Sequence, residues 1–425
     1  MTTTMKISIV GSGYVGMVTG IGFAELGNYV TFIDVDKEKI EKINSHEPPI
    51  FEKGLKELMG KNKGNYRATS DYSTIENSDI IFICVGTPPT DDGSINLSII
   101  EEASEEIGKF LSDKKYQTIV VKSTVVPDTT ENIVKPIIEN ESGKEAFKDF
   151  GLAMNPEFLR EGNAVHDFFN PDRIVIGVKD ERTKKVLETL YKPFNCPKLI
   201  TDIKTAEMIK YASNAFLATK ISFANEIGNI CKKLGIDVYK VFEGVGLDHR
   251  INPAFFRAGI GFGGSCFPKD VKALIRKAEE LGVNPQILKA VIDVNEEQPL
   301  KMIELLKKHI LNLKEKRIGI LGLAFKPDTD DIRESRAIPI IKALIKEGAK
   351  VTAYDPKAMD TFAKLFPQIE YASSAEELIA KSDAVLIVTE WEEFNGLDYS
   401  GKIVIDGRRL EKAMKEARVY EGVCW

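Results

Sequence analysis

The chain carries the same strand–turn–helix pattern twice, once near each end. In both copies an apolar strand ends in glycine, and a later strand ends in aspartate, Asp34 in the first copy and Asp355 in the second. The matching stretches are residues 6–11 with 317–322, 25–30 with 346–351, and 78–83 with 382–387. Such self-similarity indicates a duplicated unit. The second copy lacks the glycine fingerprint of the first and carries an insertion at residues 326–335. We therefore expect two Rossmann-like domains, of which only the first binds a dinucleotide.

Short apolar and β-branched runs alternate with helical stretches or loops in both copies, which is typical of mainly parallel, doubly wound sheets. The expected strands are residues 6–10, 30–34, 80–85, 118–121, 151–154, 173–178, 317–321, 350–354, 384–388 and 402–406. Between the copies, apolar residues recur at helical spacing over residues 205–234 and Gly235 supplies a stop signal. Further helical stretches cover residues 269–282 and 285–309.

The expected fold class is α/β, with two Rossmann-like doubly wound sheets joined by a long central helix and a helical middle region. We expect three domains: an N-terminal Rossmann-like domain at residues 1–203, a central helical domain at 204–312, and a C-terminal Rossmann-like domain at 313–425. A length of 425 residues suits two or three domains.

Charge and cysteine usage exclude several classes of protein. A net charge of −6 argues against a nucleic-acid or anionic-membrane partner. Five cysteines without a CxxC pair suggest reduced thiols in the cytoplasm. The polar start leads straight into a strand, so we expect no signal peptide, and no apolar run reaches the ~18 residues of a membrane span. The four histidines are scattered, so we expect no metal site.

A dinucleotide fingerprint stands at the first strand–helix junction. Gly11, Gly13 and Gly16 allow a tight turn, close approach of the backbone to a pyrophosphate, and close helix packing. The helix N-terminus would face the phosphates. Asp34 ends the next strand, where it would hold the ribose 2′-hydroxyl and repel a 2′-phosphate, so NAD is favoured over NADP. A merely structural turn is the alternative.

Polar residues follow several other strands, at the sheet edge that faces ligands in such folds. Thr87 and Thr124 could bond cofactor or water, although ordinary turn chemistry explains them equally well. Glu157 and Glu161 would share one face if their segment is helical, as paired carboxylates or as a solvated helix start. On the central helix, Lys210 could stabilise an alkoxide together with Asn214, four residues on, or could simply extend its stem to water.

Cys266 is the strongest candidate for a catalytic residue. It lies within residues 261–270, GFGGSCFPKD, where three glycines let a ligand approach the backbone, and Lys269 and Asp270 follow. Most lone cysteines are inert small hydrophobes, but this setting is unlike a core. A nucleophilic thiol together with a hydride acceptor can oxidise an aldehyde through a thioester to an acid. Five basic residues are individually weak candidates for binding phosphate or carboxylate: Arg250, Arg257, Lys326, Arg333 and Arg408.

Taken together, these motifs closely resemble the UDP-glucose 6-dehydrogenase family of nucleotide-sugar dehydrogenases, from residue 6 to about residue 409. The matching stretches are GSGYVG at Gly11, VGTP at Val85, KSTVVP at Lys122, NPEFLREG at Asn155, KYASNAFLATKISFANE at Lys210, GFGGSCFPKD at Gly261 and FKPDTDDIRES at Phe325. The form GGSCFPKD resembles the UDP-glucose branch. The resemblance implies oxidation of UDP-glucose by two NAD to UDP-glucuronate, in a homodimer built on the long central helix. It also implies NAD binding by residues 1–203, dimerisation and catalysis by residues 204–312, and UDP-sugar binding by residues 313–425.

The resemblance also implies roles for individual residues. Cys266 would form a thiohemiacetal and then a thioester, Lys210 and Asn214 would stabilise the oxyanion, and Glu157 would assist hydrolysis. Asp270 and Thr124 would position water or relay protons. Residues implied to contact NAD are Gly11, Gly13, Tyr14, Val15, Gly16, Asp34, Lys39, Thr87, Thr124, Glu161 and Arg333. Residues implied to contact the UDP-sugar are Glu157, Phe158, Leu159, Arg160, Lys210, Asn214, Arg250, Phe255, Phe256, Arg257, Gly263, Phe325, Lys326 and Arg408.

Three alternatives stay open from the sequence. The same chemistry could act on another nucleotide sugar, such as GDP-mannose or a UDP-N-acetylhexosamine. A one-step dehydrogenase of the 3-hydroxyacyl or 6-phosphogluconate type would share the fold but need no nucleophilic cysteine. A non-catalytic NAD-binding sensor would need none of Cys266, Lys210 and Glu157.

Overall fold

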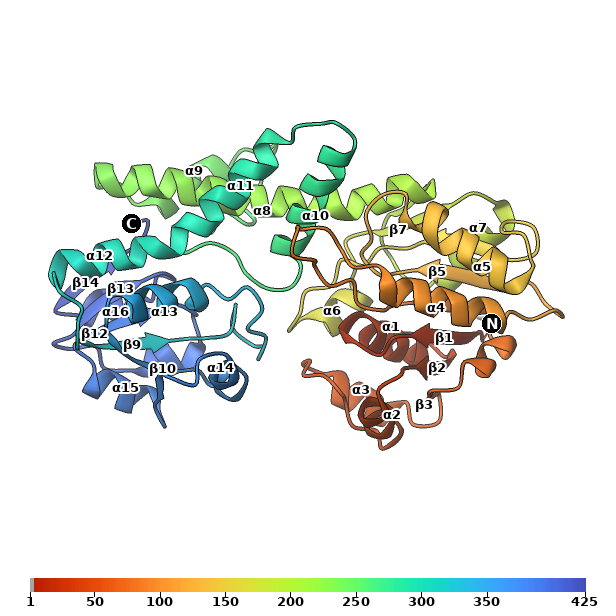
Figure 1. The fold of residues 1–425 in the computed structure, drawn as a ribbon, viewed down its shortest axis with the longest axis horizontal. Helices are drawn as coiled ribbons and strands as arrows, with labels where there is room; N and C mark the ends of the chain where they lie inside the picture. Colours follow the sequence, from red (N-terminus) through yellow and green to blue (C-terminus); the bar gives the residue numbers. More distant parts are fainter. Residues whose placement is uncertain (1–3) are drawn as a thin grey trace. The chain divides into compact units, whose positions relative to one another are not determined.

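The computed structural model describes residues 4–425, so the first three residues of the polar start lie outside it. The chain divides into two compact units, Met1–Ser213 and Asn214–Trp425. The boundary falls inside helix α8 (Ile203–Leu234), which Figure 1 draws as one unbroken helix. This confirms the long helix expected from residue 205 to 234, and Gly235 follows it with a left-handed φ of 68°. The three predicted domains, with boundaries at 203 and 312, stay a prediction.

The first unit is built on an eight-stranded sheet. Its strand order is β3-β2-β1-β4-β5-β6-β7-β8, and all neighbours run parallel except β6 and β7. The order reverses between β1 and β4, and ligands bind at such a switch point in open α/β sheets. The strands are β1 (Lys6–Val10), β2 (Tyr29–Ile33), β3 (Tyr66–Thr69), β4 (Ile80–Ile83), β5 (Thr118–Val121), β6 (Gly151–Met154), β7 (Ile174–Val178) and β8 (Lys198–Thr201).

Helices connect these strands and cover the sheet. Their bounds are α1 (Tyr14–Glu25), α2 (Lys37–Asn44), α3 (Leu55–Lys61), α4 (Ser98–Lys109), α5 (Lys135–Ser142), α6 (Ala164–Phe169) and α7 (Glu181–Leu190). Helix α1 is buried from Gly16 to Ala24, which explains why its sequence lacks a polar face. At Gly20 a side chain would collide with the ring of Phe32 on β2, so the glycine lets the helix pack closely on the sheet.

The second unit contains a smaller sheet whose strand order repeats that of the first. The order β11-β10-β9-β12-β13-β14 is the counterpart of β3-β2-β1-β4-β5-β6, and every pair is parallel. The duplication expected from the sequence is therefore confirmed. The strands are β9 (Arg317–Leu321), β10 (Lys350–Tyr354), β11 (Glu370–Tyr371), β12 (Ala384–Ile387), β13 (Ile403–Asp406) and β14 (Val419–Gly422).

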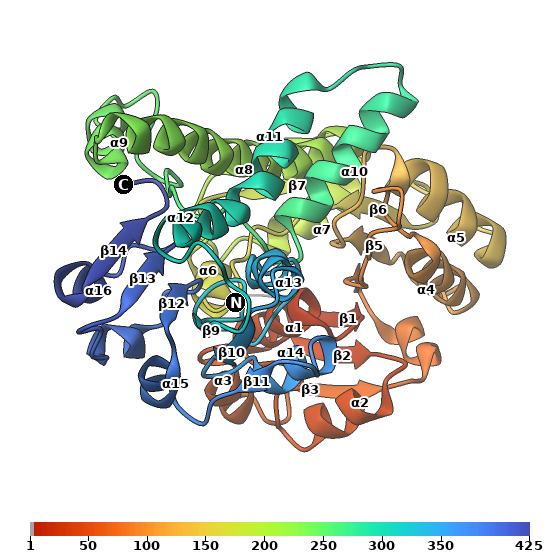
Figure 2. The same cartoon turned by 60° about the vertical axis from the view of Figure 1, so that its left-hand side comes forward.

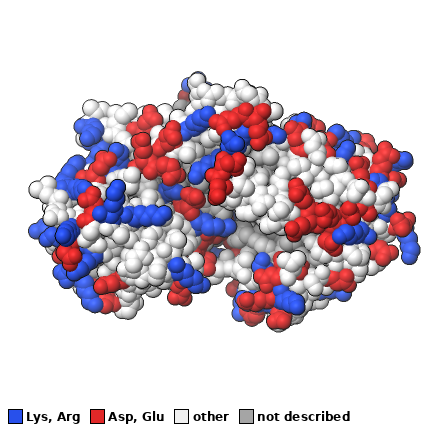
Figure 3. All heavy atoms as spheres, in the orientation of Figure 1, with Lys and Arg blue, Asp and Glu red and all other residues white. Residues whose placement is uncertain are grey.

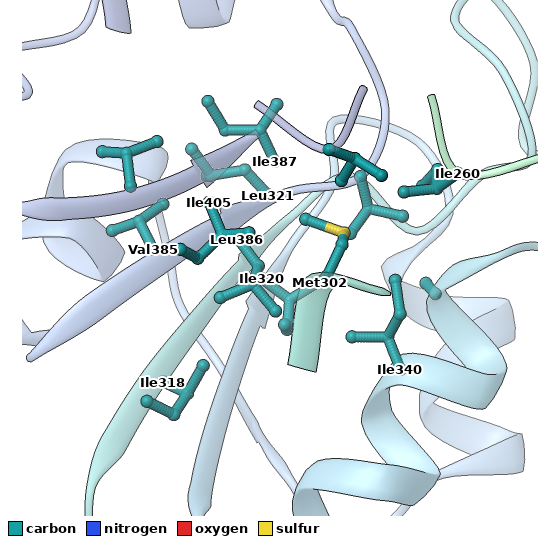
Figure 4. Close-up of a cluster of buried hydrophobic side chains, with 14 of the residues drawn as sticks. Ile260, Met302, Ile318, Ile320, Leu321, Ile340, Val385, Leu386, Ile387 and Ile405 are labelled. Atoms are coloured by element: carbon teal, nitrogen blue, oxygen red, sulfur yellow. The ribbon is translucent and has the colours of Figure 1, made fainter. Parts of the chain in front are cut away.

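The core of this second sheet is aliphatic. Figure 4 shows Ile318, Ile320 and Leu321 of β9 among side chains of the neighbouring strands, with Met302 and Ile340 close by. The residues of this cluster come from elements far apart in sequence, and burial of their apolar surface stabilises the unit. The surrounding helices are α12 (Lys301–His309), α13 (Ala337–Lys346), α14 (Met359–Leu365), α15 (Ala375–Lys381) and α16 (Glu411–Glu416).

A helical segment follows α8 and precedes this sheet. It contains α9 (Val238–Gly246), α10 (Phe267–Glu280) and α11 (Gln286–Glu297), and Figure 2 shows α10 and α11 as a helical hairpin. The single helical stretch expected over residues 285–309 is interrupted by a 3₁₀ turn at Gln298–Leu300. Pro299 lacks the N–H that a regular α-helix would use there, which explains the break.

The distribution of surface charge and the character of the helices relate to the nucleic-acid and membrane partners discussed for the sequence. On the face drawn in Figure 3, basic and acidic side chains are interspersed with uncharged ones. Within residues 4–425, no helix combines the length and the apolar character that crossing a membrane requires.

Candidate active site

The loop after β1 has the shape that a pyrophosphate requires. Gly11 has a φ of 94°, and a Cβ there would lie 2.9 Å from the carbonyl oxygen of Cys84. A Cβ at Gly16 would collide with the carbonyl oxygen of Gly11, whereas a Cβ at Gly13 would meet nothing within 4 Å. Helix α1 begins at Tyr14, so its first N–H groups face this open side. The two tight glycines shape the turn and the open one leaves room for an anion.

Asp34 lies directly after β2, beside this loop. Its carboxylate accepts hydrogen bonds from the backbone N–H of Ser12 (2.7 Å), the Ser12 hydroxyl (2.5 Å) and the N–H of Asp36 (3.0 Å). Burial opposes ionisation of Asp34, but these bonds and the charge of Lys39, 4.0 Å away, lower its pKa. An ionised carboxylate at this position fits a ribose diol and repels a 2′-phosphate.

Glu52, which the sequence did not single out, ties the glycine loop to a distant segment. Its buried carboxylate accepts hydrogen bonds from the Tyr14 hydroxyl and from the backbone N–H groups of Gly162 and Ala164, both at 2.8 Å. Burial and the neighbouring Glu52 raise the pKa of Tyr14. The contact joins residues far apart in sequence, and Glu52 follows no strand or motif. Nothing in the sequence therefore marks it.

The ends of β4 and β5 meet as expected for adjacent parallel strands. The hydroxyl of buried Thr87 donates to the carbonyl oxygen of Thr124 at 2.9 Å, and Ser123 donates to the carbonyl oxygen of Val85 at 2.7 Å. Both threonines thus belong to one group of loops at the carboxyl edge of the sheet.

Glu157 forms a buried ion pair with Lys210. The Lys210 ammonium lies 2.8 Å from Oε1 of Glu157, and the two side chains are 5% and 7% exposed. Oε2 accepts from the backbone N–H of Leu159 at 2.5 Å. Burial opposes ionisation of Glu157, but the charge and hydrogen bond of Lys210, with further help from Leu159 and Lys122, lower its pKa. The pair therefore holds a carboxylate and an ammonium out of bulk water.

The segment that carries Glu157 is not helical. Residues 155–160 form no regular element, so the conditional expectation that Glu157 and Glu161 share a helix face is wrong. The preceding Pro156 disfavours a helical conformation of Asn155, which explains the loop. Arg160, expected at the substrate, donates to Asp167 at 2.9 and 2.6 Å. The Phe158 ring lies under the guanidinium of Arg173, 3.9 Å from its centroid.

In the second unit, Cys266 stands at the N-terminus of α10. It is exposed, its sulfur lies 3.6 Å from the Ser265 hydroxyl, and all five cysteines of the chain are thiols. The preceding turn needs its glycines, because Gly261 and Gly264 have φ of 89° and 82°. A Cβ at Gly264 would lie 2.7 Å from the Phe325 ring. The partial positive charge of the helix N-terminus stabilises an anion there, as a thiolate requires.

One turn into α10, Asp270 is buried and held by two neighbours. It accepts from Asn214 of α8 at 2.6 Å and from Lys269 at 2.7 Å. Helix α8 carries both Lys210, which pairs with Glu157 in the first unit, and Asn214, which donates to Asp270 in the second unit.

The remaining basic residues expected at the substrate or cofactor form contacts within the second unit. Arg250 pairs with Asp248 and Arg333 with Asp331, while the Arg408 guanidinium donates to the carbonyl oxygen of Val388 at 2.7 Å. The Lys326 ammonium lies 5.6 Å from the centroid of the Phe325 ring. Phe256 stacks on Phe242, Phe255 has a φ of 69°, and Arg257 is exposed. A Cβ at Gly263 would collide with the carbonyl oxygen of Glu334.

In the second sheet, the counterpart of Asp34 is Asp355, which has a structural role. Asp355 is fully buried and accepts from the backbone N–H groups of Leu323 and Ala324 and from the indole of Trp391, at 2.7 to 3.0 Å. It also accepts from the N–H groups of Lys357 and Ala358. Both carboxylate oxygens of Asp355 are therefore engaged by groups of the protein itself. The second sheet therefore does not repeat the dinucleotide site of the first.

Among residues 4–425, no three His, Cys, Asp or Glu side chains come together in a group that could hold a metal ion.

Comparison with known proteins assigns each region to a domain of one family. Residues 5–195 match the NAD binding domain of the UDP-glucose/GDP-mannose dehydrogenase family, residues 204–297 its central domain, and residues 319–413 its UDP binding domain. A UDP-glucose 6-dehydrogenase of Haloferax volcanii is 48% identical, over 99% of this chain and 100% of that protein.

Two of the solved structures that resemble the chain over its whole length illustrate its relation to the family. The UDP-glucose dehydrogenase of Pyrobaculum islandicum has a TM-score of 0.96 at 45% identity. The match spans 100% of this chain and 98% of that structure. The UDP-D-ManNAc dehydrogenase of Pyrococcus horikoshii has a TM-score of 0.87 at 28% identity, with 99% coverage of both chains.

Proposed function

Because the chain belongs to the UDP-glucose/GDP-mannose dehydrogenase family, we propose that it oxidises UDP-glucose to UDP-glucuronate through a covalent intermediate on Cys266. It is an NAD-dependent oxidoreductase, and its first domain is the NAD-binding domain of that family. The single observation that carries the covalent step is the exposed Cys266 thiol at the N-terminus of α10, one turn before the buried Asp270. We propose the cytoplasm as its compartment, where such thiols stay reduced.

The proposed reaction balances at one carbon. The C6 alcohol loses a hydride and a proton to become an aldehyde. The Cys266 thiolate adds to that carbon, and the oxygen takes up a proton to give a thiohemiacetal. Loss of a second hydride, together with the hydroxyl proton, gives a thioester. Water then adds, the carbon–sulfur bond breaks, and the acid and the thiol are released. NAD, when bound, accepts the hydride in each oxidation. Retention on sulfur keeps the aldehyde in place between the two oxidations.

The chain's own polar groups suit the remaining steps. Lys210 and Asn214 would stabilise the oxyanions that form at C6, since donors aimed at developing charge lower such barriers. Glu157 is buried, ionised and held by Lys210, so it can take a proton from the hydrolytic water. Asp270 and Thr124 would position water or relay protons.

Binding is assigned to the same regions as the family's domains. The glycine loop (Gly11, Gly13, Tyr14, Val15, Gly16) and Asp34 would hold NAD, with Lys39, Thr87, Thr124, Glu161 and Arg333 as further contacts. Residues 313–425 are proposed as the UDP-sugar domain and residues 204–312 as the central domain. The substrate contacts are proposed to be Glu157, Phe158, Leu159, Arg160, Lys210, Asn214, Arg250, Phe255, Phe256, Arg257, Gly263, Phe325, Lys326 and Arg408. A large nucleotide supplies remote binding energy that fixes C6 for reaction.

Asp34→Ala is expected to weaken NAD binding by roughly 10-fold or more. It removes a charged group, and a hydrogen bond to a charged group contributes ~1.5–3 kcal/mol. The gap between NAD and NADP should narrow in steady-state kinetics. Asp36→Ala, which removes a carboxylate two residues away that caps α2, serves as the control. Equal use of NADP and NAD by the wild type would refute the role of Asp34.

We further propose a homodimer built on α8. Four apolar residues lie on one face of this helix, and each is at least half exposed: Phe216, Phe223, Ile230 and Leu234. Their spacing of seven, seven and four residues makes a continuous stripe, and such stripes mark helix–helix interfaces.

Phe223→Glu and Ile230→Glu should each weaken the dimer by roughly 30-fold or more, since a buried interface anchor contributes ~2 kcal/mol or more. Sedimentation should then detect monomers. Leu247→Glu, at an 84%-exposed position outside α8, should leave the dimer intact. An unchanged mass in both α8 variants would place the interface elsewhere.

Substrate choice is tested by recording NADH formation with UDP-glucose, GDP-mannose and a UDP-N-acetylhexosamine. We expect kcat/KM to be highest with UDP-glucose. The relatives named for UDP-glucose are 45% and 48% identical, whereas the one named for UDP-D-ManNAc is 28% identical. Faster oxidation of another sugar would support the same chemistry on that sugar, and no NADH with any sugar would favour a sensor.

A further inference from the structure

A buried lysine is hydrogen-bonded to Asn155, two residues before Glu157. Lys122 is the first residue after β5 and is only 7% exposed. Its ammonium donates to the side-chain oxygen of Asn155 at 2.9 Å and approaches the backbone oxygen of the same residue at 3.4 Å. Its hydrogen-bond partner is thus an amide rather than a carboxylate. Because a buried ammonium that bonds only an amide is costly, its presence beside Glu157 calls for a functional reason.

Asn155 holds this lysine firmly in place. Its side-chain oxygen also accepts from the Tyr191 hydroxyl, and its side-chain amide donates to the carbonyl oxygen of Val175 on β7 at 2.7 Å. Its backbone N–H donates to Val121 at the end of β5. Asn155 is thereby fixed on β5, β7 and the segment after α7, and Lys122 is fixed through it.

The fixed position brings the charge of Lys122 to bear on Glu157, two residues after Asn155. The Glu157 carboxylate is thus under the influence of two ammonium groups, Lys210 in direct contact and Lys122 through space. Both act in a buried site, where charges interact more strongly than in water.

We infer that Lys122 is a positioning residue for thioester hydrolysis: anchored on Asn155, it uses its charge to hold Glu157 ionised and ready to accept a proton. This inference rests on the proposed function of Glu157. Lys122 touches neither substrate nor water in this account and acts only through Glu157.

The charge of Lys122 is sensitive to mildly alkaline pH. Burial lowers the pKa of Lys122 to about 8; the charge of Lys210 acts in the same direction, whereas Cys84 and Glu157 oppose it. Tyr191, the other titratable group at Asn155, has its pKa raised by burial and stays neutral. Because the pKa of Lys122 is lowered, the ammonium is present below about pH 8 and is lost as the pH rises through that value. Its contribution to hydrolysis should disappear in the same interval.

The test compares Lys122→Met, which keeps the length of the side chain without its charge, with Tyr191→Phe, which removes the other donor to the same Asn155 oxygen. The thioester is formed with UDP-glucose and NAD, and its first-order decay is followed by intact-protein mass spectrometry from pH 6.5 to 9.5. At pH 7, Lys122→Met should hydrolyse it about 10-fold more slowly. The ratio of wild-type to Lys122→Met rates should fall toward one by pH 9.5. Both hydride transfers and the KM for UDP-glucose should stay within about 2-fold of the wild type.

Tyr191→Phe should keep a nearly wild-type rate and the same pH dependence. Wild-type hydrolysis by Lys122→Met, a rate ratio that does not change with pH, or equal losses in Lys122→Met and Tyr191→Phe would overturn the inference. If Lys122→Met fails to fold, the wild type still provides a test, since a wild-type hydrolysis rate that does not decline above pH 8 contradicts the inference. If Glu157→Gln itself hydrolyses normally, the proposed function fails. If Glu157→Gln stalls and Lys122→Met does not, only the role of Lys122 fails.

Discussion

Cys266→Ala loses production of the acid by at least about 10³-fold while UDP-glucose still binds, if its thiol is the nucleophile. The physical reason is that no other group can form the thioester that precedes hydrolysis. The loop itself should survive the change, because Cys266 is exposed and the turn is held by the backbone of Gly264, which donates to Arg333 at 2.9 Å. UDP-glucuronate is measured by chromatography, and binding of UDP-glucose by calorimetry.

Cys196→Ala is the matched control, since it removes another partly exposed thiol from the chain. It should keep full activity. Acid production by Cys266→Ala at a rate near the wild type would show that the cysteine takes no part. Loss of UDP-glucose binding together with activity would instead indicate a damaged loop, and Cys266→Ser would then separate the two explanations, because it preserves the shape of the side chain.

Glu157→Gln should lower kcat by about 10²–10⁴-fold, the usual range for loss of a general base. Capture and both hydride transfers should persist, so mixing with UDP-glucose and excess NAD should give a rapid burst of about two NADH per active site, followed by slow turnover. The amide keeps the shape of Glu157 and can still contact Lys210, so the change removes the proton acceptor and the buried negative charge.

Mass spectrometry of the intact variant should show a UDP-sugar adduct during the slow phase. The adduct should be absent from Cys266→Ala combined with Glu157→Gln, which serves as the control. An adduct on another residue, or a burst of one NADH, would contradict the assignment of Glu157 to hydrolysis. Loss of the burst itself would mean that Glu157 acts before the thioester forms.

The sheets could be predicted from the sequence because their central strands are buried runs of Val, Ile and Leu. β5, β6, β9 and β10 begin and end at the expected residues. The missed strands are short: β3 and β8 have four residues each, β11 has two, and β14 has four. All four mix polar with apolar residues, and β8 is only partly buried, so no hydrophobic run marks them.

The candidate site was predictable where a residue follows a strand or stands in a distinctive turn, as with Asp34, Thr87 and Cys266. The contacts between the site residues could not be predicted in the same way. The ion pair between Glu157 and Lys210 joins residues 53 positions apart, and the loop around Glu157 follows from Pro156 rather than from helical periodicity. Glu52 and Lys122 matter through contacts of buried polar groups, which no local pattern encodes.

The stoichiometry of the wild-type reaction with UDP-glucose and excess NAD distinguishes retention of the intermediate on Cys266 from release of a free aldehyde. NADH is followed by its absorbance, UDP-glucuronate by chromatography, and aldehyde by a carbonyl-trapping reagent present during turnover. We expect two NADH for each UDP-glucuronate and almost no trapped aldehyde, because the intermediate stays on Cys266. One NADH for each sugar consumed, with substantial trapped aldehyde, would contradict the covalent two-step account.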